Sequence, residues 1–174
     1  GIVSLMTSLN GQWCRALGRL IVPANMQAPL LERVMDKFSQ INIGDSLNFA
    51  TDLGPMIHSN HLAGLQSHLD GLLAQGGTAH SNSSLPDWGG NFIAPTLVTE
   101  VDAANAQNEI FGPIGTVHSY ETEAEMLALA NGTGYGLEAY IFTKDEEHGV
   151  KLGANIHGGE VKISGPSILR LGIM

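Results

Sequence analysis

The sequence predicts an α/β fold: a mostly parallel, three-layer sheet flanked by helices. Apolar runs typical of buried strands alternate along the chain with amphipathic helical segments. Helix-capping residues and turns rich in Gly and Pro separate these segments, at a spacing typical of layered α/β proteins. The chain of 174 residues is long enough to form one domain with a substantial core.

Each element follows from a local pattern. Strands are expected at 19–22, 78–80, 91–98, 115–120, 139–142 and 160–163. Helices are expected at 27–41 and 59–74 and after Thr122 and Asp145, with Ser59 capping the second of them. The apolar residues 1–6 predict a strand, and a short helix carrying Ala16 and Leu17 is expected after Cys14.

Composition argues against several classes of partner. The formal net charge is −9, and the 8 Lys and Arg residues form no run, which argues against a surface for nucleic acid or an anionic membrane. No apolar run approaches the ~20 residues of a membrane span. A single cysteine excludes an internal disulfide and fits a reducing compartment, so we expect a cytoplasmic protein.

The first informative stretch surrounds Cys14, the sole cysteine of the sequence. The thiolate is the reactive form of cysteine, and a helix N-terminus would stabilise it through unpaired backbone N–H groups. Gly11 would let backbone N–H groups approach an oxyanion closely. One interpretation is therefore a nucleophile that forms a thio-adduct with a carbonyl carbon. The other is a small buried hydrophobic residue, the usual role of a free cysteine.

The second informative stretch is 109–114, where an acid and an aromatic residue precede Gly-Pro. Pro113 restricts the backbone, so the corner can hold both side chains in place. The Glu109 carboxylate can accept hydrogen bonds from a ribose hydroxyl pair, and the Phe111 ring can pack on a flat heterocycle. The alternative is a surface acid beside a core phenylalanine.

Three histidines near the second long helix, His58, His61 and His68, raise the question of a metal site. His61 and His68 share a helix face, but no carboxylate or thiol shares their spacing. We therefore expect no metal site.

Four stretches of the chain resemble, in order, motifs of the catalytic domain of the aldehyde dehydrogenase superfamily. They are 11–14, 53–56, 90–98 and 109–114, with a weaker match at 129–131 and 135–137. The resemblance spans nearly the whole chain, and the cysteine loop combined with Glu-x-Phe-Gly-Pro is specific. The chain departs from the family at Leu9, where Asn is usual, at Arg15, where a smaller or apolar residue is usual, and at Ser164, where Asn is common.

The resemblance implies that Cys14 attacks the aldehyde carbon to form a thiohemiacetal, that hydride passes to a nicotinamide, and that water releases the carboxylic acid. It implies that Glu109 binds the nicotinamide ribose of NAD or NADP and that Phe111 packs near the nicotinamide. The backbone N–H of Cys14 would be one oxyanion donor. The implied partners are a small-molecule aldehyde and, in the full-length protein, further copies in a homo-oligomer.

Residues 1–174 are expected to form a single catalytic domain that is a fragment of a larger enzyme. In the family, the glycine-containing cofactor turn, the general-base Glu and the Asn that is the second oxyanion donor all precede the cysteine, and none is found here. Negligible dehydrogenase turnover is therefore expected from this chain alone. Two alternatives remain open: a cysteine-dependent esterase or acyl-transfer domain, and a non-catalytic domain that binds a partner subunit through its apolar ends.

Overall fold

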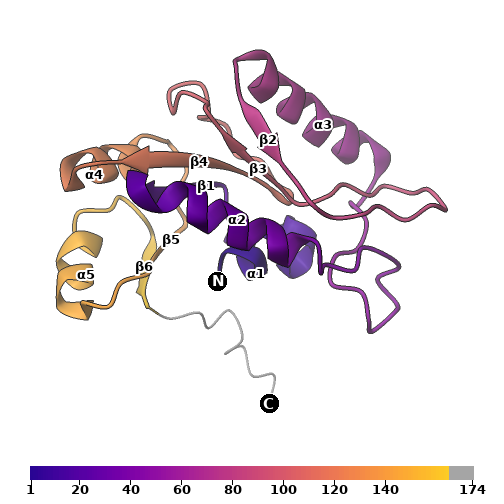
Figure 1. Ribbon diagram of the computed structural model, residues 1–174, viewed down its shortest axis with the longest axis horizontal. Helices are drawn as coiled ribbons and strands as arrows, with labels where there is room; N and C mark the ends of the chain where they lie inside the picture. The colour runs from indigo at the N-terminus through magenta and orange to yellow at the C-terminus, as the bar shows by residue number, and fades with distance from the viewer. Residues whose placement is uncertain (165–174) are drawn as a thin grey trace.

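The computed structural model describes residues 1–164, and its centre is a four-stranded sheet (Figure 1). The strands are β1 (Arg19–Pro23), β2 (Thr78–His80), β3 (Thr96–Thr99) and β4 (Ile114–Tyr120), in the order β1-β4-β3-β2. β1 and β3 both pair with β4 in parallel, whereas β2 pairs with β3 in the antiparallel sense. A second sheet joins β5 (Glu138–Ile141) and β6 (Glu160–Ile163) in parallel. The predicted α/β class with a mostly parallel sheet is confirmed.

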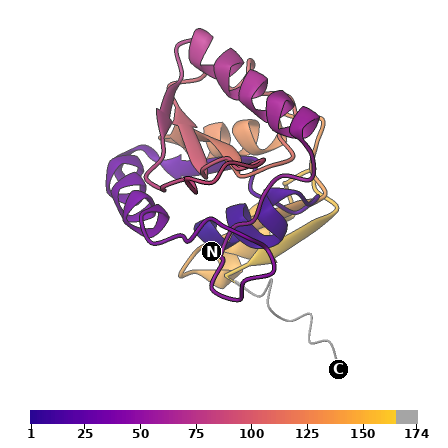
Figure 2. The same cartoon turned by 90° about the vertical axis from the view of Figure 1, so that its right-hand side faces the viewer.

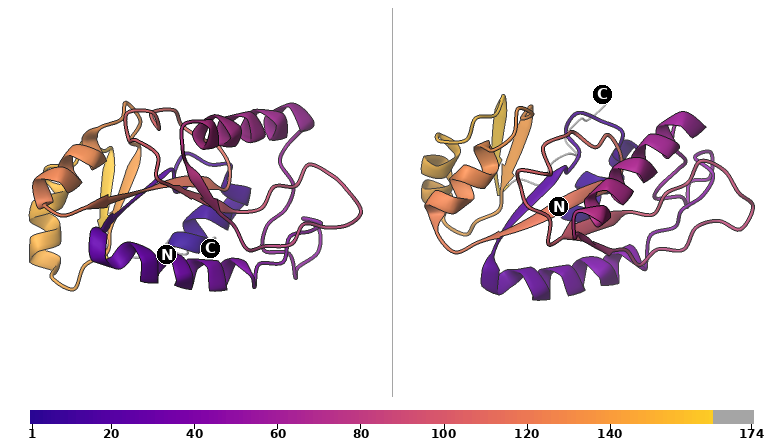
Figure 3. Two further views of the ribbon diagram at one scale, coloured as in Figure 1. Left: turned by 45° about the horizontal axis from the view of Figure 1, so that its top comes forward. Right: turned by 90° about the horizontal axis from the view of Figure 1, so that it is seen from above.

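Helices cover both faces of the larger sheet. The helices are α1 (Ile2–Thr7), α2 (Gln27–Phe38), α3 (Ser59–Ala74), α4 (Glu123–Asn131) and α5 (Glu146–Gly153), with short 3₁₀ segments η1 (Ser8–Gly11) and η2 (Ala24–Met26). The larger sheet lies between α2 and α3 (Figures 2 and 3), which forms the three predicted layers. Within residues 1–164, no helix has the length and apolar character needed to cross a membrane.

The central strand β3 shows how the sequence produces these layers. Side chains alternate between the two faces of a strand, and all four residues of β3 are buried. Leu97 belongs to the cluster that contains Phe38 of α2, whereas its neighbour Val98 belongs to the cluster that contains Leu65 of α3. Both faces of the strand are therefore buried, which explains why its two central residues, Leu97 and Val98, are both apolar.

Two predictions near the amino terminus are wrong. Residues 2–7 form helix α1 rather than a strand, with Leu5 and Met6 buried. A short apolar run fits either element, and packing of Met6 against the α2 face of the sheet decides for the helix. The helix expected after Cys14 is also absent: Ala16 N–H donates to Trp13 O at 3.0 Å, and β1 begins at Arg19. Cys14 therefore lies on a β-turn, and the interval before β1 is too short for a helix.

The helix caps were largely predictable. Thr122 and Glu125 form the expected capping box of α4, and Asp145 accepts the N–H of His148 at the start of α5. At α3 the prediction is wrong by one residue, because His58 rather than Ser59 is the N-cap, and its ring nitrogen accepts the N–H of His61. The apolar carboxyl-terminal residues 168–174 lie outside the described residues.

Candidate functional site

The loop that precedes Cys14 is hydrogen-bonded to the segment around the Gly54–Pro55 turn. The side-chain oxygen of Asn10 accepts the N–H of Gly54 at 2.7 Å, and its amide nitrogen donates to Pro55 O at 3.3 Å. The side-chain oxygen of Gln12 accepts the N–H of Ile57 at 2.9 Å. Two polar side chains just before the cysteine therefore fix its loop to a segment about 45 residues away.

Gly11 brings the same loop into backbone contact with the Gly112–Pro113 corner. A β-carbon on Gly11 would lie 2.6 Å from both the carbonyl carbon of Gly112 and the nitrogen of Pro113. Gly11 also has a φ of 69°, and Leu9 and Asn10 before it have φ values of 49° and 59°. That Gly11 lets backbone N–H groups approach an oxyanion stays a prediction, and the backbone that lies close to Gly11 in the structure is the Gly112–Pro113 corner.

Backbone hydrogen bonds join the remaining motifs. The N–H of Thr96 donates to Pro113 O at 2.9 Å, and the N–H of Met56 donates to Asn91 O at 2.7 Å. On the other side of the corner, the ring Nε2 of His61 lies 2.7 Å from Phe111 O, which requires Nε2 to carry the proton. The four stretches that resemble family motifs thus meet in one hydrogen-bonded region.

The predicted site residues all have accessible side chains. Cys14 is exposed on the Trp13–Ala16 turn, which argues against the alternative of a buried structural cysteine. Glu109 is exposed, and its carboxylate makes no hydrogen bond or ion pair within residues 1–164. Phe111 is 38% exposed, so its ring is not a core side chain. The backbone that follows Phe111 is buried at Gly112 and Pro113.

A charged cluster beside Cys14 was not predicted from the sequence. Arg15, the next residue, lies with its Nε 3.5 Å from the Glu138 carboxylate and its Nη1 3.7 Å from that of Glu160. Lys162 is also paired with Glu138, and the Tyr140 hydroxyl donates to Glu138 at 2.6 Å. The Glu138 side chain is fully buried.

The electrostatics of the cluster favour an ionised Glu138. Burial opposes ionisation, but the hydrogen bonds from Lys162 and Tyr140 and the charge of Arg15 hold the pKa of Glu138 below its usual range. Burial and the Glu138 carboxylate raise the pKa of Tyr140, which therefore stays a hydrogen-bond donor. Beside this cluster, the indole nitrogen of Trp13 is buried without a hydrogen-bond partner within residues 1–164.

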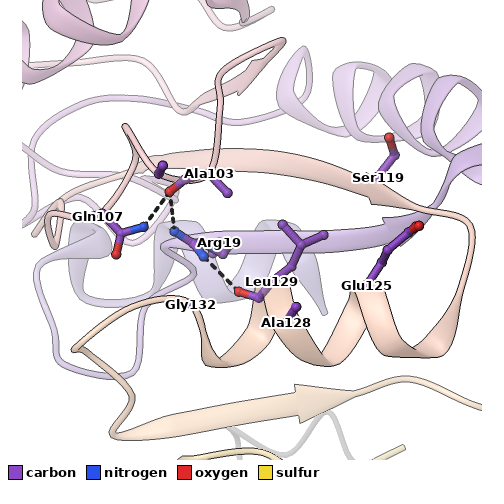
Figure 4. Close-up of a pocket in the computed structure, with 9 residues that line it drawn as sticks. Arg19, Ala103, Gln107, Ser119, Glu125, Ala128, Leu129 and Gly132 are labelled. Carbon is purple, nitrogen blue, oxygen red and sulfur yellow. Dashed lines mark hydrogen bonds between the residues drawn. The ribbon is translucent and has the colours of Figure 1, made fainter.

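A second polar feature is Arg19, at the start of β1, which lines an open pocket of about 500 Å³ (Figure 4). Its guanidinium donates to the backbone oxygens of Leu129 and Ala106, each at 2.8 Å, and of Ala103 at 3.3 Å. Burial lowers the pKa of this guanidinium. Arg19 therefore acts as a brace: it links β1 to α4 and to the loop that contains Ala103 and Ala106. Its N–H groups donate to backbone carbonyls of the protein. The sequence feature that could have predicted this role is an arginine at the first position of an otherwise apolar strand.

His118 of β4 lies on the sheet near this brace and is buried. Burial, with a further contribution from the nearby Arg19 charge, lowers the pKa of His118 to about 4. Its ring nitrogen lies 3.0 Å from the Thr116 hydroxyl. The ring is therefore neutral at pH 7. Within residues 1–164, no group of three or more His, Cys, Asp or Glu side chains is arranged to hold a metal ion.

Comparison with known proteins identifies the same family. Residues 1–172 match the model of the Aldehyde dehydrogenase family. The betaine aldehyde dehydrogenase of Brucella anthropi is 34% identical over 86% of this chain and 32% of its own length. The NADP(+) succinate-semialdehyde dehydrogenase of Escherichia coli is 30% identical over 88% of this chain and 32% of its own length.

Solved structures agree. A crystal structure of betaine aldehyde dehydrogenase from Staphylococcus aureus in complex with NAD+ superposes with a TM-score of 0.88 at 30% sequence identity. The match covers 94% of this chain and 34% of that one. The chain thus spans about a third of the length of the relatives it matches.

Proposed function

This chain belongs to the aldehyde dehydrogenase family, and from that premise we propose that it forms the single catalytic domain of an enzyme that oxidises an aldehyde to a carboxylic acid with NAD+ or NADP+. The observation that carries the proposal is the backbone contact between Gly11 and the Gly112–Pro113 corner. Cys14 lies three residues after Gly11, so their Cα atoms are at most about 11 Å apart. The contact therefore supports a site in which the thiol lies near the side chains of Glu109 and Phe111.

Cys14 is the proposed nucleophile. Its thiolate sulfur bonds to the aldehyde carbon, and the carbonyl oxygen becomes an oxyanion. The backbone N–H of Cys14 makes no hydrogen bond within residues 1–164, so it is available to donate to that oxyanion. After oxidation, Cys14 holds the acyl group as a thioester until water releases the acid.

The corner has the properties that a nicotinamide nucleoside requires. The carboxylate of Glu109 is exposed and lacks a protein partner within residues 1–164, so it can accept hydrogen bonds from the ribose hydroxyls. The Phe111 ring is partly exposed on a buried Gly-Pro backbone, so it can pack on a flat ring. A nicotinamide dinucleotide, when bound, supplies the hydride acceptor for this oxidation.

The test is aldehyde-dependent formation of NAD(P)H in a protein that carries residues 1–174 together with a dinucleotide-binding half. Betaine aldehyde and succinate semialdehyde are the first substrates to assay, because relatives are named for them. We expect Cys14→Ser to abolish turnover while dinucleotide binding is kept. We expect Glu109→Ala to weaken dinucleotide binding about 10- to 100-fold, the loss of a charged hydrogen bond. A Cys14→Ser enzyme with undiminished turnover would refute the proposal.

A second candidate function is cysteine-dependent ester hydrolysis or acyl transfer. It is favoured by the exposure of Cys14 on a turn, which lets an ester approach the thiol without any dinucleotide. The assay is release of p-nitrophenol from p-nitrophenyl acetate by residues 1–174, compared with Cys14→Ser. Equal rates for the two proteins would eliminate this function.

We also propose that the assembled enzyme is a cytoplasmic homo-oligomer. Its support is a group of strongly exposed apolar side chains, Leu47, Phe49 and Ile57, of the kind that contact surfaces carry. An exposed, unpaired cysteine supports a reducing compartment. Light scattering of the assembled enzyme tests the oligomer, and a monomer at micromolar concentration would contradict it.

A further inference from the structure

We propose that Arg15, Glu138 and Lys162 form a positioning cluster that holds the turn bearing Cys14 against the β5–β6 sheet. This inference rests on the proposed role of Cys14 as the nucleophile. The three residues are positioning residues, because they act on the reaction through the turn.

The β5–β6 sheet presents one apolar and one charged face. Glu138 and Tyr140 lie opposite Glu160 and Lys162 in the parallel register, and alternation places these side chains on one face. On the other face, Ile141, Val161 and Ile163 pack against the glycines of α5. The charged face is the one that Arg15 contacts.

Arg15 attaches the cysteine turn to that face. The turn itself is closed by one backbone hydrogen bond, from Ala16 N–H to Trp13 O. Arg15 follows Cys14 directly, and its guanidinium is within ion-pair distance of two carboxylates from two different strands. Fixing the guanidinium between Glu138 and Glu160 therefore restricts where the backbone of Cys14 can lie.

The free-energy cost of burying the Glu138 carboxylate indicates that the cluster serves to position Arg15 rather than to stabilise the fold. Glu138 is buried, and a buried carboxylate loses hydration that its ion pairs offset only in part. A buried apolar residue at this position would stabilise the fold as well or better. The charges balance, because Arg15 and Lys162 oppose Glu138 and Glu160. These charged side chains fix the direction of the Arg15 side chain, which apolar residues at the same positions would not do.

The experiment measures the turn directly in residues 1–174. Hydrogen exchange of the amides of residues 13–17 reports turn opening, and alkylation reports Cys14 alone because the sequence holds one cysteine. We compare Arg15→Met, Arg15→Lys and Glu138→Gln with Lys151→Met, a control that removes the exposed pair of Lys151 with Glu147. Arg15 is 41% exposed, so its variants keep the fold even if Glu138→Gln does not.

We expect Arg15→Met to speed exchange of residues 13–17 about threefold to tenfold, with partial recovery in Arg15→Lys and no change in the control. A charge-sensitive readout is the alkylation rate with iodoacetate divided by that with iodoacetamide. Arg15→Met leaves a net negative cluster and lowers this ratio about twofold, whereas Glu138→Gln leaves a net positive cluster and raises it about twofold. Loosening of the structure alone would change both rates together and leave the ratio constant.

Unchanged exchange and an unchanged ratio in Arg15→Met would overturn the proposal. An equal effect in the Lys151→Met control would also overturn it. These measurements use neither aldehyde nor dinucleotide. Failure of the nucleophile proposal would instead appear as turnover that survives Cys14→Ser.

Discussion

Gly11→Ala tests the contact between the cysteine loop and the Glu-x-Phe-Gly-Pro corner. Gly11 has a φ of 69°, a conformation that costs an alanine roughly 1–2 kcal/mol. The added methyl would lie 2.6 Å from two backbone atoms of the corner and 2.8 Å from Met6 O. Backbone cannot rotate away as a flexible side chain can, so overpacking adds about 1–3 kcal/mol. We therefore expect Gly11→Ala to lower the free energy of unfolding by about 2–5 kcal/mol.

The assay is urea unfolding of residues 1–174 at pH 7, followed by tryptophan fluorescence. The matched control is Gly71→Ala, because Gly71 lies inside α3 with nothing within 4 Å of an added methyl. That substitution should stabilise the protein by about 0.5–1 kcal/mol, the difference in helix propensity. If Gly11→Ala unfolds at the same urea concentration as Gly71→Ala, the loop and the corner are not in contact.

Three further predictions concern single residues. Leu9 has a left-handed φ of 49°, which Asn adopts more readily, so Leu9→Asn should raise the free energy of unfolding by about 0.5–1 kcal/mol in the same urea assay; a loss would contradict this. The pKa of His118 is lowered to about 4 in the folded state against about 6.5 unfolded. The unfolded state therefore binds the proton first, and stability present above pH 6.5 is lost as the pH falls towards 4, by up to about 3 kcal/mol. His118→Gln should remove this part of the pH dependence, whereas His157→Gln, at an exposed site, should keep it; two identical profiles would refute the assignment. Thr122→Ala should cost about 1 kcal/mol, because it removes the N-cap of α4, and no change in the urea midpoint would contradict it.

Local patterns were enough to predict most of the fold. The helices α4 and α5 begin where their capping side chains stand, because a cap depends on residues within one turn. The strand expected at 91–98 is present only from Thr96 to Thr99, because Pro95 directly precedes its first residue and lacks the N–H that a ladder needs. The first helix was missed because residues 2–7 fit two elements equally well, and only packing against α2 distinguishes them.

The candidate site was predictable only in part. The sequence singled out Cys14, Glu109 and Phe111 because their residue types and their glycine and proline neighbours suit the chemistry. It gave no sign of the Arg15 cluster, since its partner Glu138 is more than a hundred residues away in the chain. The brace made by Arg19 was missed for the same reason: its acceptors on α4 and in the loop before the corner are set by the tertiary fold.

The most direct test of the site is a paramagnetic label on Cys14, the one cysteine of the chain. A nitroxide attached there should strongly broaden the amide signals of Glu109, Phe111 and Gly112 in NMR spectra of residues 1–174. The same signals should recover when the label is reduced. If these three amides keep full intensity with the label oxidised, Cys14 does not lie beside the corner, and the proposed active site is wrong.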